Sequence, residues 1–342
     1  MQGRPTINDV AQAAGVSKSA VSYALSGRGR IGAETRERVL AVAAELGWQP
    51  SQQARGLSSS RTYAVGLVFA RPAELIGADP FFAPFIAGVE AELSHHKYAL
   101  LSQVIVGGEA EEEEGYRRLV SGGRVDGMIL TDLRDIDPRI GLLRDLGMPY
   151  VAVGRPMQAI DGPAVSNDDS ASVTAAVDHL ADLGHQRIAQ VSGSRALVHG
   201  LERERAFHRA LAARGLYAGT VIPGDFTGQS GAEGMCALLE LSPRPTAIIF
   251  ANGLMAIAGM QEAARQGVSV PADVSVVALD DNPIAPFVTP ALTAVHTDVL
   301  LWGSLSARTI MACIEGEPDT ADVVLTSELV VRGSTAPPPP PA

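Results

Sequence analysis

Two adjacent carboxylates, Asp280 and Asp281, directly follow the aliphatic run VVAL at residues 276–279. Paired carboxylates can do acid–base chemistry. At the carboxyl end of a parallel strand, however, they are also well placed to bind the hydroxyl groups of a ligand. The sequence contains no P-loop, GxSxG or HExxH motif, and these motifs would mark phosphate binding, a nucleophilic serine or a metalloprotease. We therefore predict a binding protein that is not an enzyme and that needs no cofactor.

Other groups of potential metal ligands give equally weak signals. Two cysteines are too few for a disulfide framework or a cysteine-based zinc site. His95 and His96 are neighbours on a predicted helix and point in two directions, so we expect solvated side chains and no metal. The acidic run of Glu109 and Glu111 to Glu114 begins a predicted helix, where negative charge suits the helix dipole. We expect this run to form a solvated face.

The charge of the chain is unevenly distributed. The 342 residues carry a net charge of −11, but residues 1–62 hold eight basic and four acidic side chains, which leaves −15 for the remainder. A basic head on an acidic body suggests a nucleic-acid-binding module joined to another domain. No apolar run reaches the roughly 18 residues of a membrane span, and no secretory signal is visible, so we expect a cytoplasmic protein without membrane contact.

The basic head has the spacing of a helix-turn-helix. A capping-box-like start at Thr6 begins the first helix, Gly15 supplies the turn, and Ser17 is a good N-cap for a helix from Lys18 to about Leu25. A third helix is predicted over residues 33–46. The second helix leaves Lys18 and its polar neighbours on its outer face. A small three-helix bundle of another kind is the alternative.

The acidic body alternates short aliphatic runs with helical stretches, which is typical of parallel sheets with crossover helices. Its roughly 280 residues exceed what one sheet usually holds. We predict strands at residues 63–69, 98–104, 125–130, 150–153, 187–191, 247–250 and 274–279, and helices at residues 82–94, 170–183, 201–213 and 254–265.

The segment from Thr6 to Ser51, TINDVAQAAGVSKSAVSYALSGRGRIGAETRERVLAVAAELGWQPS, resembles the N-terminus of the LacI/GalR (lactose-repressor) family of bacterial transcription regulators. The similarity continues through SQQARGLSSSRTYAVGLV and a DPFF segment to LVVRGST near the end, and so covers essentially the whole chain. The resemblance implies an α-helical head, a hinge helix and an α/β body of two lobes like those of periplasmic binding proteins. The expected boundaries are 1–50 for the head, 51–62 for the hinge, 63–334 for the effector-binding and dimerisation body (lobes 63–161 with 292–320, and 162–291 with 321–334), and 335–342 for a flexible proline-rich tail.

The resemblance also implies how the head binds a palindromic operator in double-stranded DNA. The second helix enters the major groove, and Leu57 of the hinge wedges between base steps of the minor groove. Tyr23 stands where many members carry arginine, and it either contacts bases or only a phosphate. A plain solvated linker is the alternative for the hinge. The DNA-binding residues expected in this way are Thr6, Ser17, Lys18, Ser19, Ser22, Tyr23, Arg55 and Leu57.

For the effector, the resemblance places hydrogen-bonding groups and aromatic rings in a cleft between the lobes. A polyol needs multidentate polar groups and an aromatic face. For the phenylalanines the alternative is lobe core, and for Arg203 it is a surface position. Gly253 stands where the family usually has aspartate, which puts the cap of the next helix or a ligand contact in question. The expected effector-binding residues are Phe81, Phe82, Arg155, Arg203, Phe226, Asn252 and Asp280.

These features together predict a homodimeric, ligand-responsive DNA-binding transcription regulator. We expect a repressor of carbohydrate-utilisation genes that a sugar effector releases from its operator. A purine- or nucleoside-responsive regulator of the corepressor type is the alternative within the family. A small-molecule binding protein that does not bind DNA is the alternative from another class.

Overall fold

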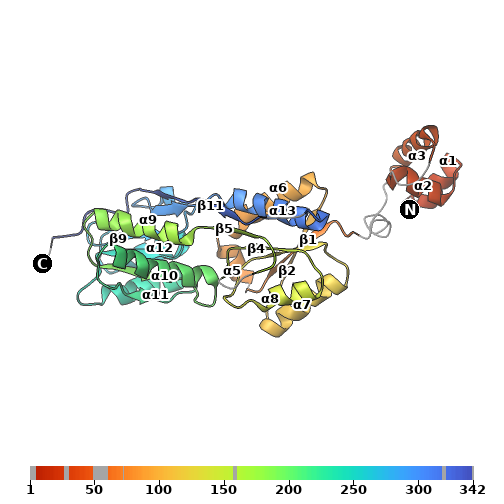
Figure 1. Cartoon of the computed structure of the whole chain (residues 1–342). Coiled ribbons are helices and arrows are strands. Elements are labelled where there is room, and N and C mark those ends of the chain that lie inside the picture. Colours follow the sequence, from red (N-terminus) through yellow and green to blue (C-terminus); the bar gives the residue numbers. More distant parts are fainter. Residues whose placement is uncertain are drawn as a thin grey trace. The chain divides into compact units, whose positions relative to one another are not determined.

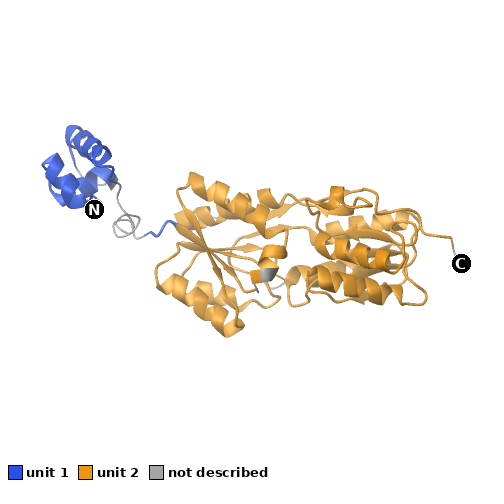
Figure 2. Ribbon diagram, turned by 180° about the vertical axis from the view of Figure 1, so that it is seen from behind, with its two compact units in different colours: residues 1–63 blue, residues 64–342 orange. Residues whose placement is uncertain are grey.

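The computed structural model (Figure 1) describes residues 5–26, 31–48, 61–71, 73–156, 160–317 and 321–340. The chain forms two compact units, residues 1–63 and 64–342 (Figure 2). No helix in the described part of the chain is both long enough and apolar enough to cross a membrane.

The first unit contains the three predicted helices, α1 (Ile7–Ala14), α2 (Lys18–Ser26) and α3 (Ala33–Glu45). The Asp9 carboxylate accepts a hydrogen bond from the backbone N–H of Thr6 at 2.7 Å. Gly15 ends α1 in the left-handed conformation at φ 66°, which glycine adopts without steric cost. The Ser17 hydroxyl accepts from the Ala20 N–H at 3.2 Å and caps α2. These contacts confirm the helix-turn-helix prediction for the head.

The second unit consists of two lobes, each built on a six-stranded sheet. The first sheet is parallel and has the order β11-β5-β4-β3-β1-β2. Helices cover both of its faces (Figure 1), with α6 packed on α13 on one side and α7 beside α8 on the other. The strands are β1 (Ala64–Phe69), β2 (Ala99–Val104), β3 (Gly127–Leu130), β4 (Tyr150–Val153), β5 (Ala164–Asn167) and β11 (Val323–Leu325), and the helices are α5 (Ala73–Ala78), α6 (Phe82–His95), α7 (Glu109–Ser121), α8 (Pro138–Asp145) and α13 (Val299–Glu315).

The second sheet has the order β12-β10-β9-β8-β6-β7 and is parallel except for the antiparallel pair β10–β12. One apolar cluster lies between the sheet and α11 with α12, and another between the sheet and α9 with α10. The strands are β6 (Ile188–Val191), β7 (Val221–Ile222), β8 (Ala247–Phe250), β9 (Ser275–Ala278), β10 (Thr293–His296) and β12 (Glu328–Val330), and the helices are α9 (Asp169–Asp182), α10 (Val198–Ala213), α11 (Gly228–Leu239), α12 (Gly253–Arg265) and the short 3-10 helix η1 (Ala285–Phe287).

The strand register aligns the carboxyl ends of the central strands. Val191 of β6 lies opposite Phe250 of β8, which lies opposite Ala278 of β9. In the first sheet, Leu67 of β1 lies opposite Ile129 of β3. The residues that follow these strands therefore meet at one edge of each sheet, where ligands of such folds bind.

The lobe boundaries lie later in the chain than the sequence predicted. β5 pairs with β4, Ala152 opposite Ala164, so the first crossing follows Asn167 and not residues 161–162. The second crossing follows β10 and not residues 290–292, and the third lies between β11 and β12 and not at residues 319–322. The Asp161-Gly162 turn connects two strands of one sheet, and turn residues by themselves cannot distinguish such a connection from a crossover between lobes.

The start of the tail is bound to the second lobe, contrary to the prediction that residues 335–342 form a flexible end. The hydroxyl of Thr335 lies 3.0 Å from His179 Nε2. The Ala336 carbonyl oxygen lies 2.9 Å from His185 Nε2, and the Ala336 N–H donates to Ser275 Oγ at 3.0 Å. His185 is buried, and a buried polar ring needs such partners. Residues 341 and 342 lie outside the described part.

The acidic run at the start of α7 is only partly solvated. Glu111, Glu113 and Glu114 are exposed, as predicted, but Glu112 is 2% exposed. Its carboxylate lies 3.2 Å from Nη1 of buried Arg139 and 2.5 Å from Nη2 of Arg134. The helical register turns this one glutamate inward, so the prediction of a solvated face is wrong for Glu112.

Glu112→Gln is expected to lower the free energy of unfolding by about 1–3 kcal/mol, because a charged hydrogen-bond acceptor of buried Arg139 is lost. Urea denaturation measures this change. Glu113→Gln is the matched control, since Glu113 is exposed and pairs with Arg117 on the helix surface. Equal small effects of the two substitutions would show that burial of Glu112 contributes nothing.

Candidate functional site

The outer face of α2 presents the residues expected to contact DNA. Lys18 and Ser19 are exposed, Ser22 is half-buried and Tyr23 is 49% exposed. Ser17 and Thr6 are exposed at the starts of α2 and α1. A helix N-terminus with free donors is suited to phosphate, whereas lysine and tyrosine side chains can reach base edges. The hinge residues Arg55 and Leu57 lie outside the described part of the chain.

Lys18→Ala and Tyr23→Ala are each expected to cost about 1–3 kcal/mol on the operator and to relax base preference at different positions. Fluorescence anisotropy with operator and random duplexes separates base contacts from phosphate contacts. Gln12→Ala, at an exposed position of α1, is the control. If Lys18→Ala weakened binding to both duplexes by the same factor, Lys18 would contact phosphate and not a base.

Between the two lobes lies a cavity of about 300 Å³ at the carboxyl ends of the strands. It is the size of a small-ligand pocket. Six of the seven residues expected to bind effector line it: Phe81, Phe82, Arg203, Phe226, Asn252 and Asp280. Arg155 is not part of the wall. Its side chain is 64% exposed and pairs with Asp322 at 3.1 Å, so the structure does not bring it to the other six.

Arg203 of α10 is buried between two carboxylates. Its Nε donates to Asp169 at 2.7 Å and its Nη2 donates to Asp280 at 2.9 Å. Its Nη1 donates to the Ala251 carbonyl oxygen at 2.8 Å. Burial by itself would lower the pKa of Arg203, but the carboxylates of Asp280 and Asp169 hold that pKa above its usual value. The arginine is therefore a fixed cation, and the surface interpretation of Arg203 is wrong.

The first lobe carries a matching arrangement that the sequence analysis missed. Arg71, after β1, donates to both oxygens of Asp132, after β3, and its Nη1 donates to Asp79 at 3.1 Å. Despite burial, these carboxylates raise the pKa of Arg71 above its usual value. Both Arg71 and Asp132 follow predicted strands, so the rule that singled out Asp280 could have found them.

Phe226 lies on the cavity wall in a conformation that bulky side chains rarely adopt, at φ 70°. The Asn252 side chain holds it there: its amide nitrogen donates to the Phe226 carbonyl oxygen at 3.0 Å, while its oxygen accepts from the Met255 N–H and caps α12. Both polar atoms of Asn252 thus have protein partners, and it positions Phe226. The cap of α12 is intact, and a Cβ at Gly253 would lie 2.8 Å from Asn282 Cβ, which explains glycine there.

His199 is a further wall residue that the sequence analysis did not identify. Its ring centroid lies 5.1 Å from that of Phe226. Burial, together with the nearby positive charge of Arg203, lowers the pKa of His199, so the imidazole is neutral at pH 7. Neither ring nitrogen has a hydrogen-bond partner among the described residues, which leaves both available to a ligand.

Gly193→Ala is expected to displace the Phe226 ring, because a Cβ at Gly193 would lie 2.0 Å from its Cζ atom. Effector affinity should fall about tenfold or more, since cores tolerate such overlap only by movement of the side chain. Isothermal titration calorimetry measures this. Gly77→Ala is a suitable control, because a Cβ added at Gly77 would meet open space. Gly215→Ala is not suitable, because the positive φ at Gly215 would strain alanine. Unchanged affinity would show that the ring is not needed for binding.

The cavity wall as a whole is acidic. It contains Arg71 and Arg203 against six aspartates, namely Asp79, Asp132, Asp169, Asp280, Asp281 and Asp298. Among the described residues, no group of three or more His, Cys, Asp or Glu side chains could hold a metal ion. Such a wall disfavours anions and suits a ligand with many neutral hydroxyl groups. A hydroxyl group can donate a hydrogen bond to a carboxylate and can accept one from a guanidinium group.

Comparisons with known proteins agree with this description. A family model described as "Bacterial regulatory proteins, lacI family" matches residues 6–51, and one described as "Periplasmic binding protein-like domain" matches residues 177–335. The HTH-type transcriptional regulator CelR of Thermobifida fusca is 34% identical over 336 residues, which cover 97% of this chain and 98% of that protein.

Two solved structures are similar over nearly the whole chain. The transcriptional regulator CelR–cellobiose complex has a TM-score of 0.75 and 32% identity, covering 97% of this chain and 100% of that one. The lac repressor dimer bound to operator and the anti-inducer ONPF has a TM-score of 0.85 and 26% identity, covering 98% and 100%. The helix-turn-helix head is consistent with the family matches and with the extent of these similarities. The chain therefore belongs to the LacI family of DNA-binding transcription regulators.

Proposed function

We propose that this regulator is a homodimeric repressor of carbohydrate-utilisation genes and that a neutral sugar in the interlobe cavity releases it from its operator. The observation that carries the proposal is the pairing of each cavity arginine with two carboxylates. Arg71 lies between Asp79 and Asp132, and Arg203 lies between Asp169 and Asp280. Each group keeps a net negative charge, so a phosphorylated or carboxylated ligand would meet repulsion.

The aromatic side chains of the cavity support the same ligand class. Phe81, Phe226 and Trp302 line the cavity beside the carboxylates. The C–H face of a sugar ring packs on an aromatic face while its hydroxyl groups bond to planar polar groups. Phe82 contributes less, because it is 2% exposed and packs edge-on against Phe69.

A contact between the lobes supports the proposed link from effector to DNA binding. The Val198 N–H at the start of α10 donates to the Leu133 carbonyl oxygen of the first lobe at 2.8 Å. A ligand that bridges the cavity walls would change the equilibrium between lobe arrangements by its difference in affinity for them. In the proposed mechanism this shift misaligns the two hinges of the dimer, where Arg55 contacts DNA and Leu57 wedges between base steps.

Operator release with a panel of sugars and nucleosides tests the proposal. The operator is selected from random duplex DNA with the full-length protein, and its affinity is then measured with each compound present. At least one neutral saccharide should weaken operator binding, and sugar phosphates should not. A purine or nucleoside that strengthens operator binding while all saccharides are silent would overturn the sugar assignment and favour a corepressor type of regulation.

A further inference from the structure

The start of α10 contacts the first lobe through both its backbone and a side chain. The Val198 N–H donates to the Leu133 carbonyl oxygen at 2.8 Å. The Val198 side chain is buried in an apolar cluster that includes Leu133, Ile140 and Leu143, and among the described residues it is the only member of that cluster from the second lobe. We call the pair of Leu133 and Val198 the interlobe contact. This contact stabilises any lobe arrangement in which it forms over one in which it is broken.

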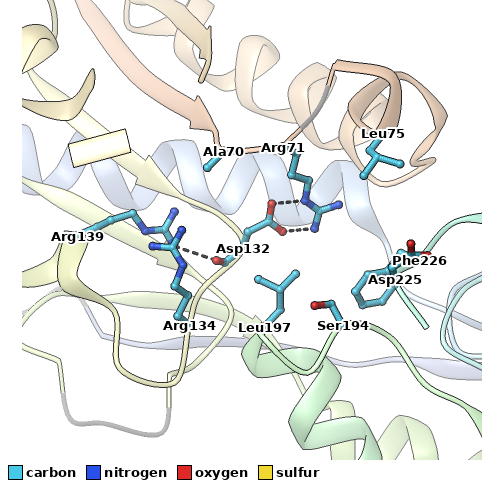
Figure 3. A pocket seen from close by; sticks show the side chains of 10 residues that line it. All are labelled: Ala70, Arg71, Leu75, Asp132, Arg134, Arg139, Ser194, Leu197, Asp225 and Phe226. Carbon is cyan, nitrogen blue, oxygen red and sulfur yellow. Dashed lines mark hydrogen bonds and ion pairs between the residues drawn. The ribbon is translucent and has the colours of Figure 1, made fainter. Parts of the chain in front are cut away.

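The loop between β3 and α8 presents Leu133 from a strained backbone. Asp132, directly before Leu133, has φ 53°, in a region that costs free energy for most residues other than glycine and persists only where the surrounding structure holds it. Arg139 provides such a hold, because its Nη2 donates to the Asp132 carbonyl oxygen at 2.9 Å. Figure 3 shows both residues on the wall of a second cavity of about 230 Å³. The position of Leu133 therefore depends on Arg139.

Arg139 is itself fixed by two carboxylates. Its Nε donates to Asp137 at 2.8 Å, and its Nη1 donates to Glu112 of α7 at 3.2 Å. Arg139, Asp137 and Glu112 are all buried. A guanidinium group is planar and donates in fixed directions, so the anchoring of Nε and Nη1 also directs Nη2 at the Asp132 carbonyl oxygen. A lysine ammonium group would keep the charge but not this geometry.

The loop that Arg139 holds is connected to both walls of the 300 Å³ cavity. The Asp132 carboxylate pairs with Arg71 on the wall of the first lobe. Val198 begins α10, the helix that carries Arg203 on the wall of the second lobe. Arg139 is not among the described residues that line this cavity. It can therefore influence a bound effector through the loop, and not by direct contact.

We propose that Arg139 is a positioning residue for the effector response: it holds the Asp132 carbonyl oxygen, sets the strength of the interlobe contact and so shifts the balance between the lobe arrangements that favour operator and effector. This inference rests on the proposed function, in which effector binding releases the operator through a change of lobe arrangement. A weaker interlobe contact changes the relative free energy of these arrangements. The effector concentration that releases half of the operator then changes, although no side chain of the 300 Å³ cavity is lost.

Two substitutions weaken the interlobe contact from opposite lobes. Arg139→Lys keeps the charge and loses the planar donor geometry. Val198→Pro removes the N–H that donates to Leu133 and keeps an apolar side chain. Proline is favoured at the first position of a helix, and Leu197 before it is extended, at φ −109° and ψ 140°, which is the conformation that a following proline requires.

Each substitution has a matched control. Arg144→Lys makes the same exchange at an exposed position of α8. Gly228→Pro places proline at the first position of α11, after Thr227, which is extended at φ −84° and ψ 153°. The atoms nearest to a Cβ at Gly228 belong to Ala258 and Leu254 of the second lobe, so this control leaves the interlobe contact unchanged.

Operator release is measured by fluorescence anisotropy with the full-length protein and the neutral saccharide of the panel that weakens operator binding by the wild type. Arg139→Lys and Val198→Pro should shift the saccharide concentration for half release in the same direction, each by about two- to tenfold, which corresponds to one net hydrogen bond. The double variant should shift it no further than the larger of the two single shifts, because both substitutions act on one contact. The two controls should leave it unchanged.

Hydrogen–deuterium exchange, measured by mass spectrometry of overlapping peptides, reports the interlobe contact without any effector. The Val198 N–H should exchange faster in Arg139→Lys than in the wild type and in Arg144→Lys. Unchanged exchange, additive shifts in the double variant, or single shifts in opposite directions would overturn the positioning role of Arg139. If exchange is faster but no saccharide releases the operator, the proposed function and the link to the effector are overturned, and Arg139 still holds the interlobe contact.

Discussion

Arg203→Ala is expected to abolish the effector response while operator binding persists. The substitution leaves the carboxylates of Asp169 and Asp280 without their shared cation, which lowers the free energy of unfolding. Separately, the lost charged hydrogen bond to the ligand weakens binding by on the order of 1.5–3 kcal/mol, or roughly tenfold to a hundredfold in affinity. Calorimetry measures effector binding, and anisotropy with labelled operator measures DNA binding with and without effector.

Two further variants make this result interpretable. Arg209→Ala removes an arginine of the same helix whose side chain is 57% exposed, and it should leave the response intact. Arg203→Lys keeps the charge but loses the planar donor geometry, so it should retain folding and recover only part of the effector affinity. Normal effector-induced release in Arg203→Ala would remove Arg203 from the proposed site.

Operator affinity is expected to fall about 10³–10⁵-fold between 50 and 200 mM salt, as for proteins that neutralise 6–10 phosphates. The cause is counterion release by the basic head, because the body carries the excess of negative charge. A variant without residues 1–60 should lose all operator binding and keep effector binding, since residues 64–342 form a compact unit of their own.

Fluorescence anisotropy over a salt series gives the slope of the logarithm of operator affinity against the logarithm of salt concentration. Calorimetry of the shortened protein gives its effector affinity. Potassium glutamate in place of chloride checks that the slope reflects counterions and not unfolding. Sequence-specific DNA binding by the shortened protein would contradict the assignment of the operator contacts to the head.

Local sequence was sufficient to predict the head and the buried strands. The turn at Gly15 and the cap at Ser17 depend on a few neighbouring residues, and β4 and β8 are buried apolar runs found within the predicted bounds. β5 and β10 were not predicted, because four residues of which two are polar give little periodic signal. The first two lobe boundaries depended on these two strands and were displaced for that reason, and the third depended on β11 and β12, which were not predicted either.

By itself the sequence determined the family, the helix-turn-helix head, the alternation of strands and helices, and six residues of one cavity wall. Only the tertiary structure decided what those six residues do: Asn252 holds Phe226, and Arg203 is fixed between two carboxylates. It also showed the Arg71 and Asp132 pair, the inward turn of Glu112, and the exposed position of Arg155. The physical reason is that pairing and burial are set by residues tens of positions apart, whose distances follow from strand register and helix packing and not from local spacing.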